Sequence, residues 1–447
     1  MNQEPSSEST PAAPGGHPFA AVGVGASAGG LKAFLEFLRA LPPDTGMAFV
    51  LVQHLSPTHE SALATILSRA TSMIVEEVAD EPTLQPNHVY VIPPAKDMLI
   101  VNGRLQLLAR EAAGLQHPID RFFRALAEDE SQMAIGVVLS GTANDGTLGL
   151  EEIKAHGGIT FAQDDSAEQQ GMPHNAIASG CVDFVLSPQE IAHEIALIAN
   201  HPQVSSRSTD QASEDSVGDP PLSKQTLKPI FNRLRQTCGV DFSEYKSSTL
   251  VRRVRRRMVM QKQEKLADYE RLLREDSEEL QALCQDVLIN VTSFFRDPEM
   301  FEYLASDVIP TLLEKHPSAE PIRAWVLGCS SGEEAYSLAM LFAEAFESRG
   351  GRLSVQIFAT DLSAPGVAQA RAGVYSAARL HNVSKERLER FFVETKGGFR
   401  VIKPIREMCV FSRHNVISDP PFSRMDLVTC RNLLIYFEPL LQQRVIP

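Results

Sequence analysis

The N-terminal part of the chain contains the sequence FAAVGVGASAGG at residues 19–30, which is the strongest indication of its fold class. Residues 19–24 are an apolar run typical of a buried strand, and apolar residues at helical spacing predict a helix over Leu31–Leu41. Between them, residues 25–29 have the G-x-S-x-G arrangement. Its glycines permit a sharp strand-to-helix turn that exposes the Ser27 hydroxyl at the edge of a sheet. The stretch therefore predicts an α/β fold with a candidate nucleophile.

Strands and helices continue to alternate after this stretch, which predicts a doubly wound parallel sheet. Further strands are expected at 48–52, 134–139, 159–162 and 181–186, helices at 60–68, 119–128 and 148–156, and a hairpin-like pair at 88–92 and 98–101. A second α/β block has expected strands at 322–327, 355–359 and 427–429. Its last residues resemble a helix and strand cut off before the sheet is complete, as in a fragment of a longer chain.

These patterns divide the chain into five predicted segments. They are a disordered leader at 1–17, an α/β domain at 18–200, a polar linker at 201–226, a small all-helical domain at 227–301 and a Rossmann-like domain at 302–447 with an incomplete sheet.

Composition excludes several classes of protein. The 447 residues carry 42 Lys and Arg against 56 Asp and Glu, a net charge of -14, which argues against a general nucleic-acid binder. An uninterrupted apolar run of about 18 residues and a secretory leader are both missing from the sequence, so we expect a cytoplasmic protein without membrane insertion. The six cysteines include no C-x-x-C pair, which favours reduced thiols over a disulfide frame or a metal site.

Two further polar residues follow strands that neighbour the serine turn. The strand at 48–52 is followed by His54, and the strand at 134–139 runs into a loop that contains Asp145. Because the carboxyl ends of parallel strands meet at one edge of a sheet, Ser27, His54 and Asp145 can come together as nucleophile, base and orienting acid. A nucleotide-binding loop and a purely structural turn stay open, although the glycine spacing misses G-x-G-x-x-G.

The motifs at 24–30, 52–54 and 139–146, with those at 89–94 and 171–173, resemble the catalytic domain of the CheB-type chemotaxis methylesterases. The resemblance implies that Ser27 is the nucleophile, His54 the general base and acid, Asp145 the residue that orients His54, and the Thr142 N–H an oxyanion donor. The implied substrate is the γ-glutamyl methyl ester of chemoreceptor helices, with glutamine deamidation at the same site. Ala28, where the family usually has a hydroxyl residue, and Thr142, where it often has Met, are departures that bear on rate and specificity.

The second α/β block has a cofactor-type turn. Its first strand runs into a Gly- and Ser-rich turn at 328–334, which lets a cofactor approach the backbone closely, and the strand at 355–359 is followed by Asp361. An acidic residue there is placed to accept hydrogen bonds from ribose hydroxyls. The residues alone leave a nucleotide, a dinucleotide or S-adenosylmethionine (SAM) open.

The segments 289–297, 325–339, 359–361, 411–415 and 426–437 resemble the CheR-type chemoreceptor glutamate O-methyltransferases. The resemblance implies SAM as methyl donor, in a pocket lined by Asn290, Thr292, Arg296, Glu333, Asp361, Asn415, Arg431 and Asn432. It also implies that Tyr436 lies beside the methyl group, where it and Arg431 orient the substrate carboxylate. That carboxylate is ionised at neutral pH, so the reaction needs placement and no general base.

Five arginines lie close together in the helical segment, at Arg252, Arg253, Arg255, Arg256 and Arg257. They span more than one helix face, so we expect some to point outward and to dock the acidic helices of methyl-accepting chemoreceptors or similar receptors. A solvated charged helix and, less favoured, a nucleic-acid methyltransferase are alternative interpretations.

Together the two resemblances predict a bifunctional chemosensory adaptation enzyme that removes and installs glutamyl methyl esters. The competing hypothesis is a signalling scaffold that docks receptor helices and has lost one or both activities.

Overall fold

The computed structural model describes residues 19–54, 62–109, 117–129, 134–205, 222–288, 291–316, 320–347, 355–380, 382–396 and 398–445. The chain forms two compact units, Met1–Glu214 and Asp215–Pro447. The predicted leader, residues 206–221 of the predicted linker and the last two residues lie outside the described residues. In the part of the chain that is described, every helix is too short or too polar to cross a membrane.

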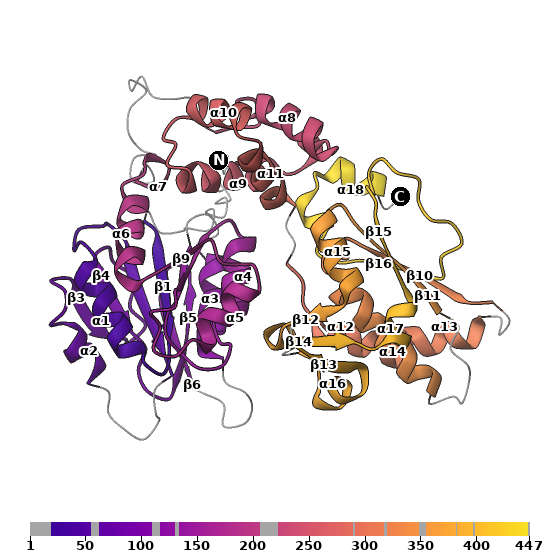
Figure 1. Ribbon diagram of the computed structural model, residues 1–447, viewed down its shortest axis with the longest axis horizontal. Helices are drawn as coiled ribbons and strands as arrows, with labels where there is room; N and C mark the ends of the chain where they lie inside the picture. Colours follow the sequence, from indigo (N-terminus) through magenta and orange to yellow (C-terminus); the bar gives the residue numbers. More distant parts are fainter. Residues whose placement is uncertain are drawn as a thin grey trace, which may run out of the picture. The chain divides into compact units, whose positions relative to one another are not determined.

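The first unit is built on a seven-stranded sheet of order β3-β4-β2-β1-β7-β8-β9, in which every neighbouring pair is parallel (Figure 1). The strands are β1 Ala21–Ala26, β2 Ala48–Gln53, β3 Ile74–Glu77, β4 His88–Val91, β7 Ile135–Val138, β8 Ile159–Gln163 and β9 Phe184–Leu186. The central strand β1 is buried along its whole length, as expected for a strand covered on both faces.

Helices cover both faces of this sheet, with α1 and α6 on one side and α3, α4 and α5 on the other (Figure 1). The helices are α1 Gly30–Ala40, α2 Leu63–Leu67, α3 Pro118–Asp129, α4 Thr147–Ala155, α5 Gly171–Ala178, α6 Pro188–Ala199 and α7 Pro202–Ser205. Helix α3 crosses β1 so closely that a Cβ on Gly25 would lie 2.4 Å from Cγ2 of Ile119. Glycine at this position therefore lets the first turn of α3 reach the sheet.

One expected strand pairing is wrong. The strand at 88–92 does not form a hairpin with 98–101, because β4 lies in the parallel sheet. The hairpin joins β5 Lys96–Val101 to β6 Arg104–Ala109. Its turn is Asn102-Gly103, where φ is 49° and 76°. Both residues have positive φ, as a tight two-residue hairpin turn requires, and Asn-Gly is the sequence signal for that turn.

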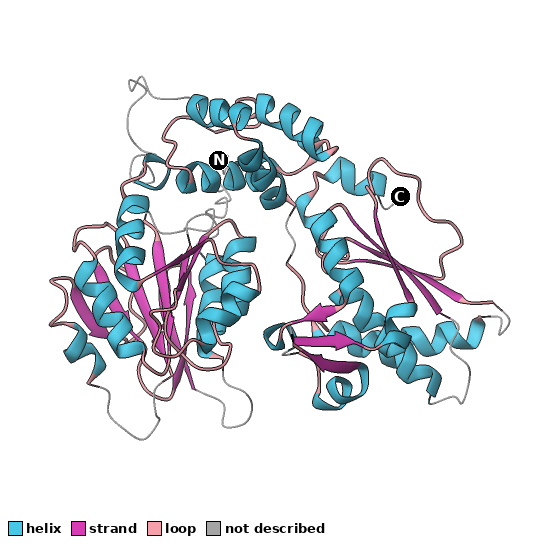
Figure 2. Cartoon of the chain, in the orientation of Figure 1, coloured by secondary structure: helices cyan, strands magenta, loops and turns pink. Residues whose placement is uncertain are grey.

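The second unit begins with a helical layer and continues into a four-stranded parallel sheet of order β15-β11-β10-β16 (Figure 2). The helical layer is α8 Lys228–Cys238, η2 Phe242–Glu244, α9 Ser247–Met260, α10 Leu266–Glu275 and α11 Ser277–Val287. The parallel strands are β10 Ile322–Leu327, β11 Val355–Asp361, β15 Cys409–Arg413 and β16 Leu427–Cys430. The predicted fold class, an α/β chain with an all-helical insert between two sheets, is confirmed.

Further helices and a small antiparallel sheet of order β12-β14-β13 complete the second unit. The helices are α12 Pro298–Tyr303, η3 Leu304–Val308, α13 Ile309–Lys315, α14 Glu333–Glu347, α15 Ala364–Ala372, η4 Ala377–Leu380, α16 Lys385–Phe391, α17 Lys403–Glu407, η5 Leu434–Tyr436 and α18 Pro439–Val445. The small sheet is β12 Val374–Tyr375, β13 Phe392–Thr395 and β14 Gly398–Val401.

Three of the five arginines of α9 are buried, whereas Arg252 and Arg255 are partly exposed, so only these two could belong to the expected outward docking surface. The exposed fractions of Arg253, Arg256 and Arg257 are 3%, 3% and 9%. Arg256 pairs with Asp286 and Arg257 with Glu279, and both acids lie on α11. The sequence shows a basic cluster, but the acids that bury it are more than twenty residues away. Arg256 and Arg257 therefore join α9 to α11 within the helical layer, and the buried arginines give no support to nucleic-acid binding.

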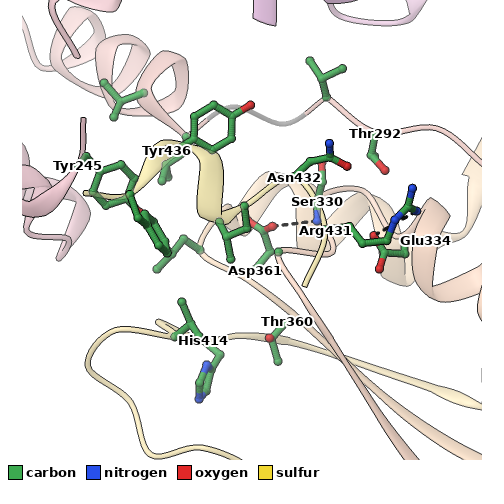
Figure 3. Close-up of a pocket in the computed structure, with 18 of the residues that line it drawn as sticks. Tyr245, Thr292, Ser330, Glu334, Thr360, Asp361, His414, Arg431, Asn432 and Tyr436 are labelled. Carbon is green, nitrogen blue, oxygen red and sulfur yellow. Dashed lines mark hydrogen bonds and ion pairs between the residues drawn. The ribbon is translucent and has the colours of Figure 1, made fainter. Parts of the chain in front are cut away.

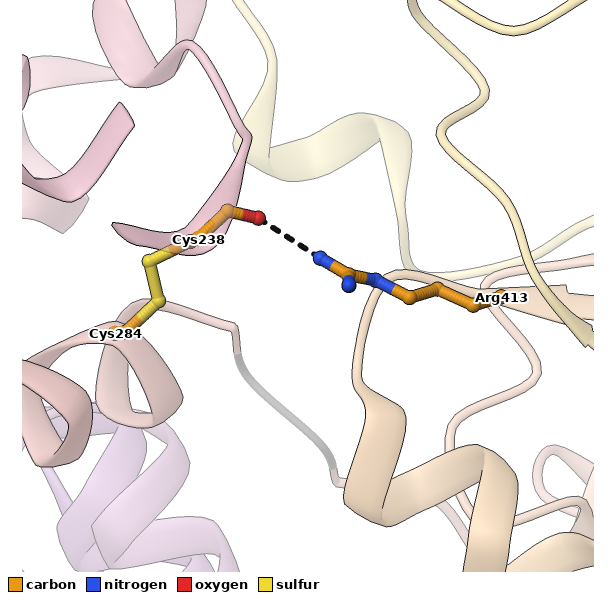
Figure 4. The surroundings of a disulfide bond; sticks show 3 residues. All are labelled: Cys238, Cys284 and Arg413. Carbon is orange, nitrogen blue, oxygen red and sulfur yellow. Dashed lines mark hydrogen bonds between the residues drawn. A yellow bond between two sulfur atoms is a disulfide. The ribbon is translucent and has the colours of Figure 1, made fainter. Parts of the chain in front are cut away.

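A disulfide joins Cys238 of α8 to Cys284 of α11, with a Cα–Cα distance of 6.4 Å (Figure 4). The expectation of six reduced thiols is therefore wrong for this pair, which is separated by 46 residues in the sequence and so gives no short-range signal. The carbonyl of Cys238 also accepts a hydrogen bond of 2.8 Å from Nη2 of Arg413. Cys238 thus joins α8 to α11 through the disulfide, and it joins α8 to the end of β15 through the hydrogen bond from Arg413.

Candidate active sites

The structure brings Ser27, His54 and Asp145 together at the carboxyl edge of the first sheet. They follow β1, β2 and β7, and β1 lies between the other two strands. The Ser27 Oγ lies 3.4 Å from Nδ1 of His54, and Nε2 of His54 lies 2.8 Å from Oδ2 of Asp145. A hydroxyl, an imidazole and a carboxylate in this chain are the elements of an activated serine nucleophile.

Asp145 fixes the tautomer of His54. An ionised carboxylate only accepts hydrogen bonds, so the proton of the imidazole lies on Nε2, which donates to Asp145. This leaves the lone pair of Nδ1 facing the Ser27 hydroxyl. The ring is therefore oriented to take the hydroxyl proton, which is the function of a general base.

Two imidazoles and backbone N–H groups keep Asp145 ionised although the side chain is buried. Burial opposes its ionisation, but the imidazoles of His117 and His54 and the N–H groups of Asp120 and Ile119 hold the pKa of the carboxyl well below its usual range. The Ile119 and Asp120 N–H groups donate over 3.0 and 2.9 Å. They belong to the first turn of α3, where free N–H groups and the helix dipole favour a negative charge. The short contact at Gly25 brings this turn to the site.

The turn that presents Ser27 depends on glycine and on the loop after β7. Gly29 has φ 76°, and a Cβ there would lie 2.6 Å from the Ser140 Oγ. The Ser27 N–H donates to the Ser140 carbonyl over 2.9 Å, and the Gly141 N–H donates to the carbonyl of Gln169 over 3.0 Å. These two N–H groups are therefore occupied, whereas Thr142 lies on the exposed part of the same loop.

The Ser27 and His54 side chains open onto a groove beside α1. The groove is lined by the residues of the serine turn, by the outer face of α1, and by the side chains that flank them: Ser27, Ala28, Gly29, Gly30, Leu31, Lys32, Leu35, Glu36, Arg39, Gln53, His54 and Glu168. Asp145, by contrast, is only 1% exposed. The nucleophile and base are thus accessible to a large substrate, while the orienting acid is sealed from water.

Among the described residues, His117, Asp120 and Asp145 form a compact polar group whose nitrogen and oxygen atoms lie within 4.8 Å of one another. The Asp145 oxygens already accept four N–H groups, from His54, Ile119, Asp120 and Gly146. Asp145 therefore belongs to the hydrogen-bond network of the triad, and His117 and Asp120 lie beside it.

The second unit contains a cavity where the ends of β10, β11 and β16 face the helical layer (Figure 3). Six of the residues predicted for the cofactor and substrate line it, namely Thr292, Arg296, Asp361, Arg431, Asn432 and Tyr436. The Asp361 oxygens accept the backbone N–H groups of Ser330 and Ser363, each over 2.8 Å. The carboxylate of Asp361 is thus held rigidly at the cavity wall.

Glu333, which was predicted to line the cofactor pocket, is not among the described residues that line this cavity. Its carboxylate is fully buried and accepts hydrogen bonds from Arg379 over 2.6 Å and from the Ser331 hydroxyl. Glu334 lines the cavity instead, where it accepts a hydrogen bond of 2.7 Å from the Thr429 hydroxyl. Burial raises the pKa of Glu334. Two adjacent glutamates at a helix start face different directions, and the sequence does not say which one meets the cavity.

Asn415 also lies outside the described lining, because its side-chain oxygen accepts the Ile417 N–H over 3.0 Å and closes a local turn. Asn290 lies outside the described residues.

The helical layer supplies lining residues that sequence reasoning missed, including Tyr245 and Thr249. The Lys246 N–H donates to the carbonyl of Tyr436 over 2.9 Å, so the helical layer and the Tyr436 segment form one wall.

Arg431 is anchored on the cavity wall by its neighbours. Its Nη2 donates to Oδ2 of Asp297 over 2.6 Å. Its Nη1 lies 3.9 Å from Oε2 of Glu334 (Figure 3). The guanidinium also lies over the ring of Phe301, 5.0 Å from its centre. A charge held in this way has little freedom to move and can orient an anionic group.

Comparison with known families assigns both halves of the chain. Residues 22–195 match the family model of the CheB methylesterase. Residues 225–288 match the all-alpha domain of the CheR methyltransferase, and residues 290–447 match the CheR SAM binding domain.

Individual relatives agree with this division. The chain is 40% identical over 400 residues to an uncharacterized 104.1 kDa protein of Rhodobacter capsulatus, in a match that spans 86% of this chain and 42% of that protein. It is 32% identical to a chemotaxis protein methyltransferase of Listeria monocytogenes, over 49% of this chain and 80% of that protein. It is 33% identical to a putative protein-glutamate methylesterase/protein-glutamine glutaminase of Leptospira interrogans, over 39% of this chain and 92% of that protein.

A solved structure, the Thermotoga maritima CheB methylesterase catalytic domain, matches with 27% identity and a TM-score of 0.37, over 40% of this chain and 97% of that chain. The chain spans about two fifths of the length of its Rhodobacter relative but most of the length of the methyltransferase and methylesterase relatives. The chain therefore belongs to the CheB methylesterase family in its N-terminal part and to the CheR methyltransferase family in the part that follows.

Proposed function

We propose that the first unit hydrolyses γ-glutamyl methyl esters, and deamidates glutamine, on signalling receptors of the chemoreceptor type, and that the second unit methylates glutamates of such receptors with SAM. The observation that carries the proposal is the hydrogen-bonded chain from Ser27 through His54 to Asp145, with 3.4 and 2.8 Å between the interacting atoms. The family memberships and the cavity beside Asp361 support the second activity.

In the esterase reaction, Nδ1 of His54 takes the Ser27 proton while Oγ attacks the ester carbonyl. The imidazolium then gives that proton to the departing methoxide, so methanol leaves and an acyl-enzyme forms. Water attacks the acyl-enzyme with His54 again as base, which releases the glutamate and restores Ser27. Asp145 holds the ring and stabilises the imidazolium. The Thr142 N–H is our candidate oxyanion donor because the N–H groups of Ser27 and Gly141 already donate to carbonyls.

The second cavity has groups that fit SAM. Gly328 lines it with φ 66°, so the cavity wall there is bare backbone in a conformation that favours glycine. Asp361 would accept hydrogen bonds from the ribose hydroxyls, and the buried acid Glu334 would balance the positive charge of the ligand. SAM, when bound, supplies a methyl group on a sulfonium. Arg431 and Tyr436 would orient the receptor carboxylate, which needs no base because it is already ionised.

The full chain should release methanol from a methylated receptor and transfer label from methyl-labelled SAM to receptor glutamates. Ser27→Ala should abolish the first activity and leave the second unchanged, and Ser72→Ala, at an exposed loop position, is the matched control. Equal methanol release by wild type and Ser27→Ala would contradict the esterase assignment. Absence of label on receptor glutamates would contradict the methyltransferase assignment.

A further inference from the structure

A second imidazole faces the orienting carboxylate of the triad. His117 precedes α3, and its Nδ1 lies 3.7 Å from Oδ1 of Asp145 and 3.8 Å from Oδ2 of Asp120. This nitrogen is buried and has no hydrogen-bond partner among the described residues. The ring as a whole is half-buried. His117 therefore approaches two carboxylates at distances at which charge matters but no hydrogen bond fixes the ring.

The two carboxylates are buried side by side, which makes a double negative charge unfavourable. Asp120 is 3% exposed, and burial together with the charge of Asp145 raises its pKa to about 8. Asp120 therefore keeps a proton at neutral pH, while Asp145 stays ionised. The contact with Asp145 outweighs partial burial and raises the pKa of His117. A positive charge on His117 would thus be balanced by the carboxylate of Asp145.

The oxygens of Asp145 are divided between the two histidines. Oδ2 accepts the hydrogen bond of His54, and Oδ1 faces His117. When His54 and His117 are both protonated to imidazolium ions, the two cations compete for the single negative charge of Asp145. A charged His117 therefore makes protonation of His54 less favourable, and it does so without touching the substrate or Ser27.

We propose that His117 is a positioning residue of the esterase site, which shares the Asp145 carboxylate with His54 and limits how strongly that carboxylate holds a protonated His54. The proposal rests on the proposed esterase function. A positive charge on His117 beside Oδ1 of Asp145 would weaken the attraction between Oδ2 and a positively charged His54.

The other charges around His117 enter the same balance. Asp120 and Arg124 face it from α3, Asp145 from the loop after β7 and His54 from the end of β2. The charge of Asp145 favours protonation of His117, and Arg124 opposes it. Because Asp145 lies next to both imidazoles, we assign the coupling between His117 and His54 to it.

The test is an NMR titration of the histidine Cε1–H groups in the full chain, labelled with 13C-histidine. His54 is identified by the signal that His54→Gln removes. In His117→Asn, the titration midpoint of His54 should rise by about 0.5–1 pH unit relative to wild type. His117→Lys, which keeps a positive charge, should stay close to wild type. His193→Asn, which removes an exposed histidine of α6, is the matched control.

The acidic limb of kcat/KM for methanol release should move in the same direction as the NMR midpoint, with kcat at high pH nearly unchanged. If His117→Asn does not fold, as judged by circular dichroism, His117→Gln replaces it. An unchanged His54 midpoint in a folded variant would overturn the proposal, as would a rise in His117→Lys equal to that in His117→Asn. Absence of methanol release by wild type would contradict the proposed function, while the NMR titration decides the role of His117 in either case.

Discussion

The esterase site and the methyltransferase cavity are both formed at the carboxyl edge of a parallel sheet, but they are completed differently. Ser27, His54 and Asp145 lie after three adjacent strands, and a single helix terminus holds the acid. The second cavity needs the sheet, the Tyr436 segment and the helical layer together. The first site carries its reactive groups in its own side chains, whereas the second mainly provides a shaped, charged wall for a cofactor. Changes at the first site should therefore affect chemistry, and changes at the second should affect binding.

The strongest change is expected in the chemistry of the first site. His54→Gln removes the base that accepts the Ser27 proton, so methanol release should fall about 100- to 10,000-fold. Label transfer from SAM should be unchanged, because the two sites share no residue. His193→Gln is the control. A parallel loss of both activities would mean that the sites are not independent.

The next largest effect concerns the ion pairs that support the wall of the second site. Glu279→Leu leaves Arg257 buried without its partner, and it also removes the acceptor of the Tyr269 hydroxyl at 2.7 Å. We expect the free energy of unfolding of the second unit to fall by about 3–5 kcal/mol in urea titrations. Arg257→Met combined with Glu279→Leu should recover most of the loss. If the single variant is as stable as wild type, these arginines are not structural and the docking interpretation returns.

A smaller effect is expected for cofactor binding. Asp361→Asn keeps the shape of the side chain but removes its charge, so the Kd for SAM measured by calorimetry should rise about 10-fold or more. Methanol release should not change. Asp307→Asn, at an exposed position, serves as the control. Unaltered SAM affinity in the Asp361 variant would show that the cofactor is held elsewhere in the cavity.

The smallest expected effect is a pH dependence of stability in the first unit. Asp120 has a folded-state pKa of about 8, above its usual value, so the folded protein binds more protons than the unfolded chain between about pH 4 and pH 8. Stability should therefore fall as pH rises through this window. Asp120→Asn should reduce the fall between pH 6 and pH 8 by about 1 kcal/mol or more, measured by urea denaturation of the first unit. Equal slopes for the two proteins would contradict the burial of a protonated Asp120.

The sequence was sufficient for features that depend on strand order and turn chemistry. Ser27, His54 and Asp145 follow strands that the apolar runs already indicate, and a parallel sheet places such residues at one edge. The same reasoning located Asp361 after the second strand of its block. It went wrong on the hairpin, where the Asn102-Gly103 signal was present but not used.

The remaining differences come from packing that short-range patterns do not encode. Glu333 and Glu334 are equivalent in the sequence, and the structure shows that Glu333 is the one buried in an ion pair with the distant Arg379. Arg257 is buried against Glu279, and Cys238 forms its disulfide with Cys284. In both cases the partner lies on a different helix, far away in the sequence. His117 belongs to no motif in the sequence, because its proposed role depends on how close its Nδ1 lies to Oδ1 of Asp145 in the folded protein.

The most direct test of the account is the reaction of the full chain with a fluorophosphonate probe, followed by mass spectrometry of the modified peptides. An imidazole-activated serine attacks such a phosphorus centre, so we predict one adduct, on Ser27, and its near loss in His54→Gln. An unmodified Ser27, or an adduct formed equally well without His54, would contradict the assignment of an activated serine to the end of β1.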